Sequence, residues 1–411
     1  MVRVIELAAL RILFLMYDHL PAFRPDVAVL FGKELPKLGI QSDLLGQLAS
    51  GRSVAEAHAW PAGQVFLHGR ERKGILGHML RPLLDVSLLW RVNSEHRLIQ
   101  VRDKIRTGLI ALLYARVSGR KMAYWMSFPF VEGFRIRHEE IGRRQGLLVW
   151  LVNGLRAVSA RSLYYGFLAA RVDHLFVQSD AMLEFMAGKG VARARMTAVP
   201  MGVDAAHFKN VCAPSVRPSL FEGRQVIAYL GVLSRSRKSE FLLDVLAAVR
   251  ASMPNAFLLL AGDAASEDEQ IWFREQIAVR GLSDHVWLTG WLPQAQALPL
   301  LKCAALGLSP FPRDYLFDTN SPTKAIEYLA LGIPCVGNEN PDQRLVLESS
   351  EGGLCVPMDV TSFRDAALKL LSDPEYAKDC GVRGQAWVAQ HRSYQAIAAK
   401  VAAVYQQLLA R

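Results

Sequence analysis

The sequence contains few cysteines, and none of them stands in CxxC spacing. The chain of 411 residues has five, an odd number: Cys212, Cys303, Cys335, Cys355 and Cys380. A structural zinc site needs clustered ligands, and a disulfide framework normally uses an even set of cysteines. We therefore expect reduced thiols, no zinc site and a cytoplasmic location.

Long apolar runs and common cofactor motifs are also missing. No stretch of 18 uncharged apolar residues is present, so no membrane-spanning helix is expected. The N-terminus lacks the layout of a cleaved signal peptide, because its apolar residues are interrupted by Arg3, Glu6 and Arg11. No GxGxxG motif follows the first expected strand, which argues against a dinucleotide. We expect no cofactor.

The composition is that of a folded globular protein. Hydrophobic residues make up 51% of the chain and charged residues 21%, and the length allows two or three domains with their own cores. The net charge is +10. This excess indicates partners that carry phosphate, or an anionic membrane surface.

Apolar runs alternate with helical patterns through the first half. Strands are expected at 11–17, 40–45, 65–68, 98–101, 121–127, 173–179 and 195–199, and helices at 26–38 and 105–117. Such alternation is typical of a parallel sheet covered by helices. Ser179 is expected to cap a helix that begins around Asp180.

A second series follows residues 211–223, which have the composition of a linker. Strands are expected at 225–230, 256–261, 286–289, 304–309, 335–337 and 353–356, and helices at 239–251, 267–279, 298–302, 360–372, 375–391 and 394–410. The sequence thus predicts an N-terminal domain of residues 1–210 and a C-terminal domain of residues 224–393, both of the α/β class.

The stretch 318–337 contains the sharpest local signal. Ser321 is placed to cap a helix with Pro322 at its first position, and the helix ends at Gly332. The free N–H groups and the dipole at such a helix start favour an anion, usually phosphate. Lys324 in the first turn is disfavoured unless an anion is near. The alternative is an ordinary capped helix with solvated charges.

A basic loop at 231–239 follows the first strand of the second series. Arg235, Arg237 and Lys238 gather three positive charges where the strand has ended. Arginine grips two phosphate oxygens at once and lysine acts as a point charge, so a bound diphosphate would relieve their mutual repulsion. Aromatic residues do not interleave with this loop, so nucleic acid is not an expected partner. A solvated basic loop is the alternative.

Polar residues also follow two expected strands of the first half. Arg102 and Asp103 come after 98–101, and Ser127 and Glu132 come at and after the end of 121–127. The carboxyl ends of parallel strands are where open α/β sheets bind ligands. We expect these four residues on the acceptor side of a site, with turn or capping roles as the alternative.

The segment 147–170 is apolar but interrupted by Arg156 and Arg161. It can lie in a membrane interface with its arginines toward the headgroups. The residues expected to face lipid are Trp150, Leu151, Leu155, Tyr164, Tyr165 and Phe167. Ordinary buried helices are the alternative.

Four segments together resemble the family 4 glycosyltransferases of the GT-B fold. They are Pro200-Met-Gly-Val-Asp204 with Phe208, residues 231–243, Leu260-Ala-Gly-Asp263 with Leu288-Thr-Gly290, and residues 325–337 with Gly352-Gly353. The resemblance covers most of 195–360. It implies two Rossmann-like domains that face a cleft, with helix 394–411 packing back on the first. It also implies a UDP- or GDP-linked sugar donor in the second domain and transfer with retention.

The resemblance also implies roles for particular residues. Arg237 and Lys238, with Arg235 as a further candidate, would grip the diphosphate and act in catalysis. The donor site would also include Gly231, Ser321, Thr323, Lys324 and Glu327. No metal is implied, and the sequence agrees, because Asp263 is followed by alanines instead of completing a DxD motif.

The chain departs from the family pattern at two points. Glu327 matches the second, ribose-binding glutamate of a Glu-x7-Glu motif, but Thr319 stands at the position of the first. Asp318, Asn320 or Ser321 is expected to replace it. Many relatives also have an N-domain histidine near the donor sugar. Ser127 is the nearest polar residue in the corresponding region, and His138 lies farther on.

Three functions are compatible with these features. The first is a cytoplasmic glycosyltransferase, peripheral on the inner face of the plasma membrane, that acts on a glycan or lipid-linked acceptor in exopolysaccharide or cell-surface glycan synthesis. The second is a nucleotide-sugar epimerase or hydrolase, which needs no acceptor. The third is a non-catalytic module that binds polyanions. The sequence favours the first.

Overall fold

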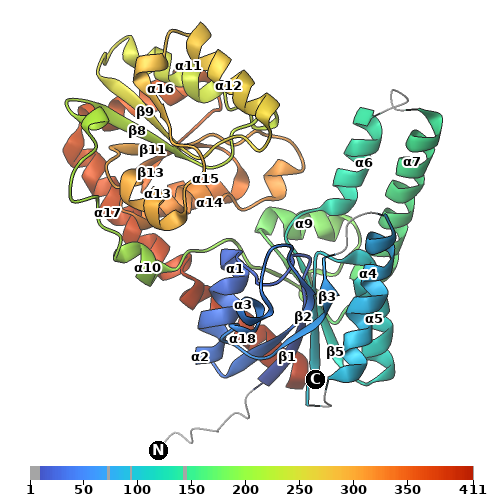
Figure 1. Ribbon diagram of the computed structural model, residues 1–411. Coiled ribbons are helices and arrows are strands. Elements are labelled where there is room, and N and C mark those ends of the chain that lie inside the picture. The colour runs from blue at the N-terminus through green and yellow to red at the C-terminus, as the bar shows by residue number, and fades with distance from the viewer. Residues whose placement is uncertain (1–9, 72–74, 93–94, 142–145, 411) are drawn as a thin grey trace, which may run out of the picture. The chain divides into compact units, whose positions relative to one another are not determined.

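The chain divides into two compact units, each described here by itself. The computed structural model describes residues 10–71, 75–92, 95–141 and 146–410 (Figure 1). Unit 1 comprises Met1–Pro200 with Tyr394–Arg411, and unit 2 comprises Met201–Ser393. The segment 211–223, expected to be a linker, lies inside unit 2.

Unit 1 is built on a parallel sheet of seven strands in its described part. Their order across the sheet is β3-β2-β1-β4-β5-β6-β7. Their bounds are β1 Leu10–Leu15, β2 Ile40–Leu48, β3 Val65–Arg70, β4 Leu98–Arg102, β5 Lys121–Met126, β6 His174–Val177 and β7 Met196–Ala198. The chain reverses its direction across the sheet between β1 and β4, and the carboxyl ends of such neighbours are where open α/β sheets bind ligands.

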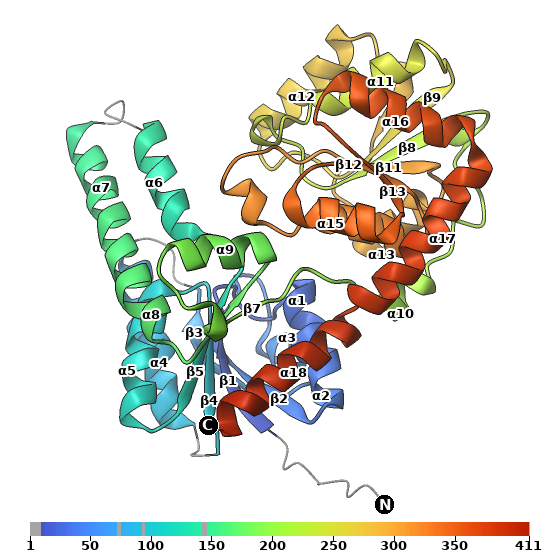
Figure 2. The ribbon, with the colours of Figure 1, turned by 180° about the vertical axis from the view of Figure 1, so that it is seen from behind.

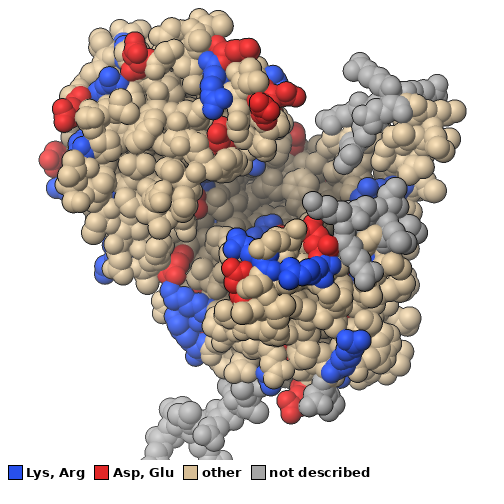
Figure 3. Space-filling model, in the orientation of Figure 1, with Lys and Arg blue, Asp and Glu red and all other residues tan. Residues whose placement is uncertain are grey.

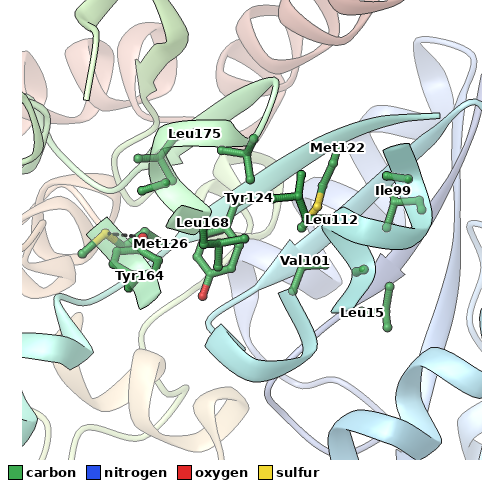
Figure 4. Packing of buried hydrophobic residues seen from close by; sticks show 14 of the residues in the cluster. Leu15, Ile99, Val101, Leu112, Met122, Tyr124, Met126, Tyr164, Leu168 and Leu175 are labelled. Carbon is green, nitrogen blue, oxygen red and sulfur yellow. Dashed lines mark hydrogen bonds between the residues drawn. The ribbon is translucent and has the colours of Figure 1, made fainter. Parts of the chain in front are cut away.

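Helices cover both faces of this sheet. They are α1 Pro25–Ala28, α2 Leu35–Lys37, α3 Val54–His58, α4 Ile75–Ser87, α5 Ile105–Val117, α6 Phe130–Ile141, α7 Leu147–Arg161, α8 Ala169–Arg171, α9 Asp180–Gly188 and α18 Tyr394–Ala410. One core lies between the sheet and α4, α5 and α9 and contains Leu15, Tyr124 and Leu168 (Figure 4). The other core lies against α1, α2 and α18.

The last helix belongs to unit 1 although the chain reaches it from unit 2. Tyr394, Ile397, Val401 and Tyr405 of α18 are buried in the core on one face of the first sheet (Figure 2). The hydroxyl of Tyr405 donates to Oε1 of Gln100 on β4 at 2.7 Å. Helix α18 therefore completes the cover of that face.

Unit 2 contains a parallel sheet of six strands, in the order β10-β9-β8-β11-β12-β13. The strands are β8 Gln225–Leu230, β9 Ala256–Ala261, β10 Val286–Leu288, β11 Leu306–Ser309, β12 Cys335–Asn338 and β13 Gly353–Val356. Every residue of β9 is buried, as expected of a strand covered on both faces. The chain passes from β10 on one side of β8 to β11 on the other side.

Eight helices surround the second sheet in the described part. They are α10 Ala205–Lys209, α11 Phe241–Arg250, α12 Glu267–Val279, α13 Gln294–Leu301, α14 Thr323–Ala330, α15 Pro341–Ser350, α16 Val360–Ser372 and α17 Pro374–His391. Helices α11, α12 and α16 bury one face and α10, α13, α14 and α15 the other, while α17 contributes to both cores. The predicted α/β class with two parallel sheets is confirmed.

Three local predictions were wrong. The expected helix at 26–38 is divided into α1, a π-helical turn Leu30–Glu34 and α2. Helix α14 begins one residue later than expected, because Pro322 takes the N-cap position. In the segment 147–170, Tyr164 and Tyr165 are buried in the core, so these two aromatic side chains do not face outward. By contrast, Ser179 caps α9 as predicted, since its hydroxyl accepts from the Met182 N–H at 3.0 Å.

Candidate functional site

The loops that follow β8 and β11 meet at the carboxyl edge of the second sheet. These two strands are neighbours at the point where the chain reverses its direction across the sheet, which is where open α/β sheets bind ligands. Their pairing is short, with only Ile227 and Ala228 of β8 opposite β11. Beyond this pairing the Tyr328 hydroxyl accepts from the Leu230 N–H at 2.7 Å and donates to the Leu308 carbonyl at 3.2 Å. A tyrosine thus bridges the strands where the ladder stops.

The loop after β8 is held in shape by two serines. The Ser234 hydroxyl accepts from the Arg237 N–H at 3.3 Å, and the Ser239 hydroxyl accepts from the Ser234 N–H at 2.9 Å. These bonds form a short 3-10 turn at Arg235–Arg237. Lys238 then has a φ of +51°, the left-handed conformation that lets the chain turn into α11. The backbone conformation therefore fixes the positions from which the side chains of Arg237 and Lys238 extend.

The three basic residues of this loop differ in their surroundings. The Arg235 guanidinium lies 4.6 Å from the centre of the Trp272 ring on α12, and the backbone N–H of Arg235 donates to Oε1 of Glu269 at 3.2 Å. Arg235 is thereby tied to α12. Lys238 is exposed and Arg237 is partly exposed. Both side chains are accessible to a ligand.

Lys324 and Gly231 come together from α14 and β8. A Cβ atom placed on Gly231 would lie 3.1 Å from Cε and 3.6 Å from Nζ of Lys324. The Lys324 ammonium lies 5.1 Å from the centre of the Tyr229 ring, and the side chain is buried. No ion pair among the described residues involves Lys324. The loop after β8 and the start of α14 were predicted separately as anion sites. These contacts show that the two lie next to each other.

The start of α14 has no side-chain cap. Pro322 at the N-cap has no N–H. Its first N–H groups lack intrahelical partners, and the positive end of the dipole lies there. The predicted capping role of Ser321 was wrong. Its hydroxyl donates to Oδ2 of Asp342 at 2.6 Å and accepts from the Met201 N–H at 3.0 Å.

Asp342 also pairs with a buried arginine that has no sequence signal of its own. Nη2 of Arg392 lies 2.7 Å from Oδ1 of Asp342, and both side chains are almost fully buried. This pair holds the Ser321 segment against the end of α17. The ion pair thus supports the loop before α14. Its two partners lie so far apart in the chain that no spacing pattern in the sequence predicts it.

Glu327 lies one turn after Thr323 on α14. Burial raises the pKa of its carboxyl, although Lys324 and a hydrogen bond from the Thr323 side chain act to lower it. The side chain is partly exposed. The three polar residues Thr323, Lys324 and Glu327 therefore form one group along the first turns of the helix.

The residues before this helix show what stands in place of the family's first glutamate. Thr319 is buried, and its hydroxyl donates to the Leu316 carbonyl at 2.7 Å. Asp318 pairs with Arg313, with Oδ2 2.8 Å from Nη2. The side chains of Thr319 and Asp318 thus both have partners within the protein. Asn320 is partly exposed. Which of them replaces the glutamate stays a prediction.

The residues after β9 and β10 line part of a hollow beside β10, whose lining also includes Ser283 and Val286 at the other end of that strand. Asp263 follows β9, and Thr289 and Gly290 follow β10; all three line this hollow of about 430 Å³. Gly262 and Gly290 form an isolated bridge between the two loops. A Cβ on Gly262 would lie 2.1 Å from the Gly231 carbonyl oxygen, so only glycine fits there. The close approach keeps the loops after β8, β9 and β10 together.

In unit 1, three of the four predicted acceptor-side residues lie together at the carboxyl edge. Asp103 has a φ of +56°, accepts from the Ser127 N–H at 2.9 Å and also accepts from the Ser127 hydroxyl. Arg102 pairs with Asp103 at 3.4 Å and with Asp26 at 2.6 Å. Burial raises the pKa of Asp103, against the effects of Arg102 and Ser127. Arg102 belongs to β4 itself and does not follow it.

Lys104 also lies at this edge, in a buried network that the sequence pattern does not predict. Its ammonium lies 2.6 Å from Oδ2 of Asp85, which also binds His68 at 2.9 Å and Thr107 at 3.0 Å. Burial lowers the pKa of Lys104 to about 8, although Asp85 acts to raise it. The sequence pattern does not predict this network, because its members come from β3, α4 and the start of α5.

Glu132 and His138 are placed elsewhere. Glu132 pairs with Lys189 at 3.0 Å and with Arg135 at 3.2 Å, and accepts from the Tyr165 hydroxyl at 3.3 Å. It therefore ties α6 to the end of α9. His138 packs against Trp150 with ring centres 5.1 Å apart and the rings tilted by 33°, between α6 and α7. The structure does not bring either residue to Ser127.

Comparison with known proteins agrees with this arrangement. Residues 224–373 match the family model described as "Glycosyl transferases group 1". Among solved structures, sucrose-phosphate synthase from Thermosynechococcus elongatus aligns with a TM-score of 0.70 at 18% identity, covering 97% of this chain and 99% of that one. HepE from Anabaena in complex with UDP aligns with a TM-score of 0.69 at 16% identity, covering 97% and 100%. The chain has the GT-B fold of glycosyltransferases.

A further structure with this GT-B fold is the α,α-trehalose 6-phosphate synthase from Burkholderia multivorans. It aligns with a TM-score of 0.65 at 14% identity, covering 98% of this chain and 97% of that one. No curated protein matches the sequence. The family match contains Gly231, Lys324 and Glu327, so the matched segment is the one that carries the candidate site.

Proposed function

We propose that this GT-B chain transfers a sugar from a UDP- or GDP-linked donor to a glycan or lipid-linked acceptor, with retention, in exopolysaccharide or cell-surface glycan synthesis. The meeting of Lys324 and Gly231 at the uncapped start of α14 carries the proposal. The group 1 family match supports sugar transfer. Retention is included because the four matched segments resemble those of retaining enzymes.

The diphosphate of the donor is proposed to lie over Gly231. Lys324 and the first N–H groups of α14 would bind it from one side, and Arg237 and Lys238 from the loop. These groups would stabilise the negative charge that develops on the leaving diphosphate as the sugar bond breaks. The solved complexes of HepE with UDP and with UDP-glucose support a donor of this class.

Glu327 and the hollow beside Asp263 are proposed to recognise the nucleoside. A carboxylate one turn from the diphosphate site can accept hydrogen bonds from a ribose, and the resemblance implies that role for Glu327. The residues after β9 and β10 line part of this hollow. It is the proposed place of the base.

Ser127, Arg102 and Asp103 are proposed to act on the acceptor side. Asp103 holds both the N–H and the hydroxyl of Ser127, so the serine has a fixed position at the carboxyl edge of unit 1. Glu132 is bound to Lys189 and Arg135, which leaves it a weaker candidate for this role. A lipid-linked acceptor would require the enzyme to work at a membrane surface.

A panel of nucleoside diphosphates and their sugars tests the donor class. A ligand that binds the folded chain raises its Tm, and more so the tighter it binds. Isothermal titration of Lys238→Ala and Glu327→Ala then tests the site, since each variant should lose affinity and turnover. Unchanged affinity in both variants would refute the placement of the diphosphate.

Simple measurements distinguish glycosyl transfer from the two alternative functions. A nucleotide-sugar epimerase or hydrolase would convert the donor without an acceptor, which product analysis of donor alone would reveal. A polyanion-binding module is favoured by the net charge of +10 and by Thr319 in place of a glutamate. It would bind long polyanions more tightly than any nucleotide sugar and would release no sugar.

A further inference from the structure

Helix α7 turns its largest aliphatic side chains to solvent. Leu148 is 75% exposed, Leu155 72% and Val158 65%. The other exposed aliphatic side chains of the helix are Leu147, Val149, Leu151 and Val152. A surface helix normally turns its apolar stripe to the core. A continuous exposed stripe of this kind marks an interaction surface.

The packing against α6 fixes this orientation. The side of α7 that meets α6 carries small residues: Ala157 is buried, and a Cβ on Gly154 would lie 2.9 Å from Cε1 of His138. The Trp150 ring also contacts this histidine. The two helices lie side by side in both ribbon views (Figures 1 and 2). The hairpin therefore holds the aliphatic stripe outward.

The charges on α7 and on the residues that adjoin it in the chain have one sign, whereas the neighbouring helix α6 carries both signs, with Glu139 paired to Arg135. Residues 141–172 contain five arginines and no aspartate or glutamate. Arg156 lies on α7 itself, with its guanidinium 4.3 Å from the centre of the Phe134 ring. Uncharged surface predominates over the described part of this hairpin (Figure 3). An apolar stripe with arginines and without acids complements anionic lipid headgroups over an acyl layer.

The helix is not free to span a bilayer. It continues into a π-helical turn, Ser162–Leu168, and the side chains of Tyr164, Tyr165 and Leu168 in that turn are buried in the core of unit 1. No helix among the described residues is long and apolar enough to cross a membrane. A second copy of the chain would bring the same positive charge against this surface, which disfavours a dimer through α7.

We infer that the exposed face of α7, Leu147 to Val158, docks flat on an anionic lipid bilayer. The aliphatic side chains enter the boundary between headgroups and acyl chains, and Arg156 and Arg161 bind lipid phosphates. Leu113 and Val117 of α5 and Phe167 are further exposed apolar residues of unit 1. This surface goes beyond the proposed function and holds whichever donor or acceptor the enzyme uses.

Vesicle flotation with the full chain tests the inference. Wild type should float with vesicles that contain phosphatidylglycerol and should remain at the bottom with phosphatidylcholine alone. The variant Leu148→Gln/Leu151→Gln/Leu155→Gln should bind the anionic vesicles at least tenfold more weakly. The matched control is Ile271→Gln/Val279→Gln/Val382→Gln, three exposed aliphatic residues of unit 2 that should not change binding.

Two further measurements complete the test. Arg156→Gln/Arg161→Gln should reduce binding to phosphatidylglycerol vesicles and bring it near that to phosphatidylcholine. UDP and GDP affinities should be the same in wild type and the leucine variant, which separates this surface from the donor site. The inference is overturned if wild type does not float, or if the leucine variant floats as well as wild type. It is also overturned if that variant only converts a dimer to a monomer.

Discussion

The ammonium of Lys324 lies 5.1 Å from the centre of the Tyr229 ring, and its Cε reaches the space over Gly231. The ring attracts the cation, but a ring alone is a weak partner for a buried ammonium. No ion pair of the described residues compensates this charge. We propose that this cation is held for an anionic ligand.

Lys324→Ala should weaken nucleoside diphosphate binding by about 10- to 100-fold, because a charged hydrogen bond contributes about 1.5–3 kcal/mol. Isothermal titration with UDP and GDP measures the change. Lys378→Ala on α17 is the matched control, since it removes the same charge from an exposed position of unit 2. Equal affinities in the two variants would place the diphosphate elsewhere.

Glu327→Gln should change how stability depends on pH. Burial raises the pKa of this carboxyl, so the folded chain holds the proton more tightly than the unfolded chain does. The stabilising contribution is then complete below the ordinary glutamate pKa and is lost as pH rises through the raised value. The Tm of wild type relative to the glutamine variant should fall as the pH rises above about 4, the ordinary glutamate pKa. A constant difference would contradict the raised pKa.

Tyr328→Phe tests the bridge between β8 and β11. Removal of the hydroxyl leaves the Leu230 N–H and the Leu308 carbonyl without this partner while the ring still fills its place. We expect a loss of about 1–3 kcal/mol in the free energy of unfolding, measured by urea denaturation. Tyr17→Phe, at an exposed tyrosine, is the control and should have no effect.

Asp342→Asn should destabilise the chain through Arg392. The substitution leaves a buried guanidinium without its charged partner, which costs about 3–5 kcal/mol. Glu184→Gln breaks the pair with Arg193 on the surface, where both side chains are more than half exposed, and should leave the Tm unchanged. Similar Tm values for the two variants would show that the buried pair contributes little.

Repeating local patterns in the sequence were sufficient to predict most of the fold. The bounds of β8, β9, α12 and β13 agree with the expected ranges, because each is an apolar or amphipathic run limited by turn residues. The start of α14 was misplaced by one residue, since a proline fits either the N-cap or the first helical position. Local patterns thus predict elements well and their ends less well.

The candidate site was predictable only in part. Gly231, Lys324 and Glu327 all come after strands of the second sheet, in a loop or in the first turns of a helix. The carboxyl ends of parallel strands share one edge, so the sequence was sufficient to place these residues there. The pairs Arg102–Asp26 and Arg392–Asp342 join residues far apart in the chain and have no periodic signal. Glu132 was expected at an acceptor site, but Lys189 from another helix engages it.

The return of α18 to unit 1 has a practical consequence for dissecting the chain. A fragment that ends at Pro200 would lack Tyr394, Val401 and Tyr405, and would expose the apolar face that they cover. Truncation from the C-terminus would damage the first unit before it reached the second. Separate expression of the first unit therefore requires residues 394–411 to be grafted after residue 200, whereas 201–393 can be excised as one continuous piece.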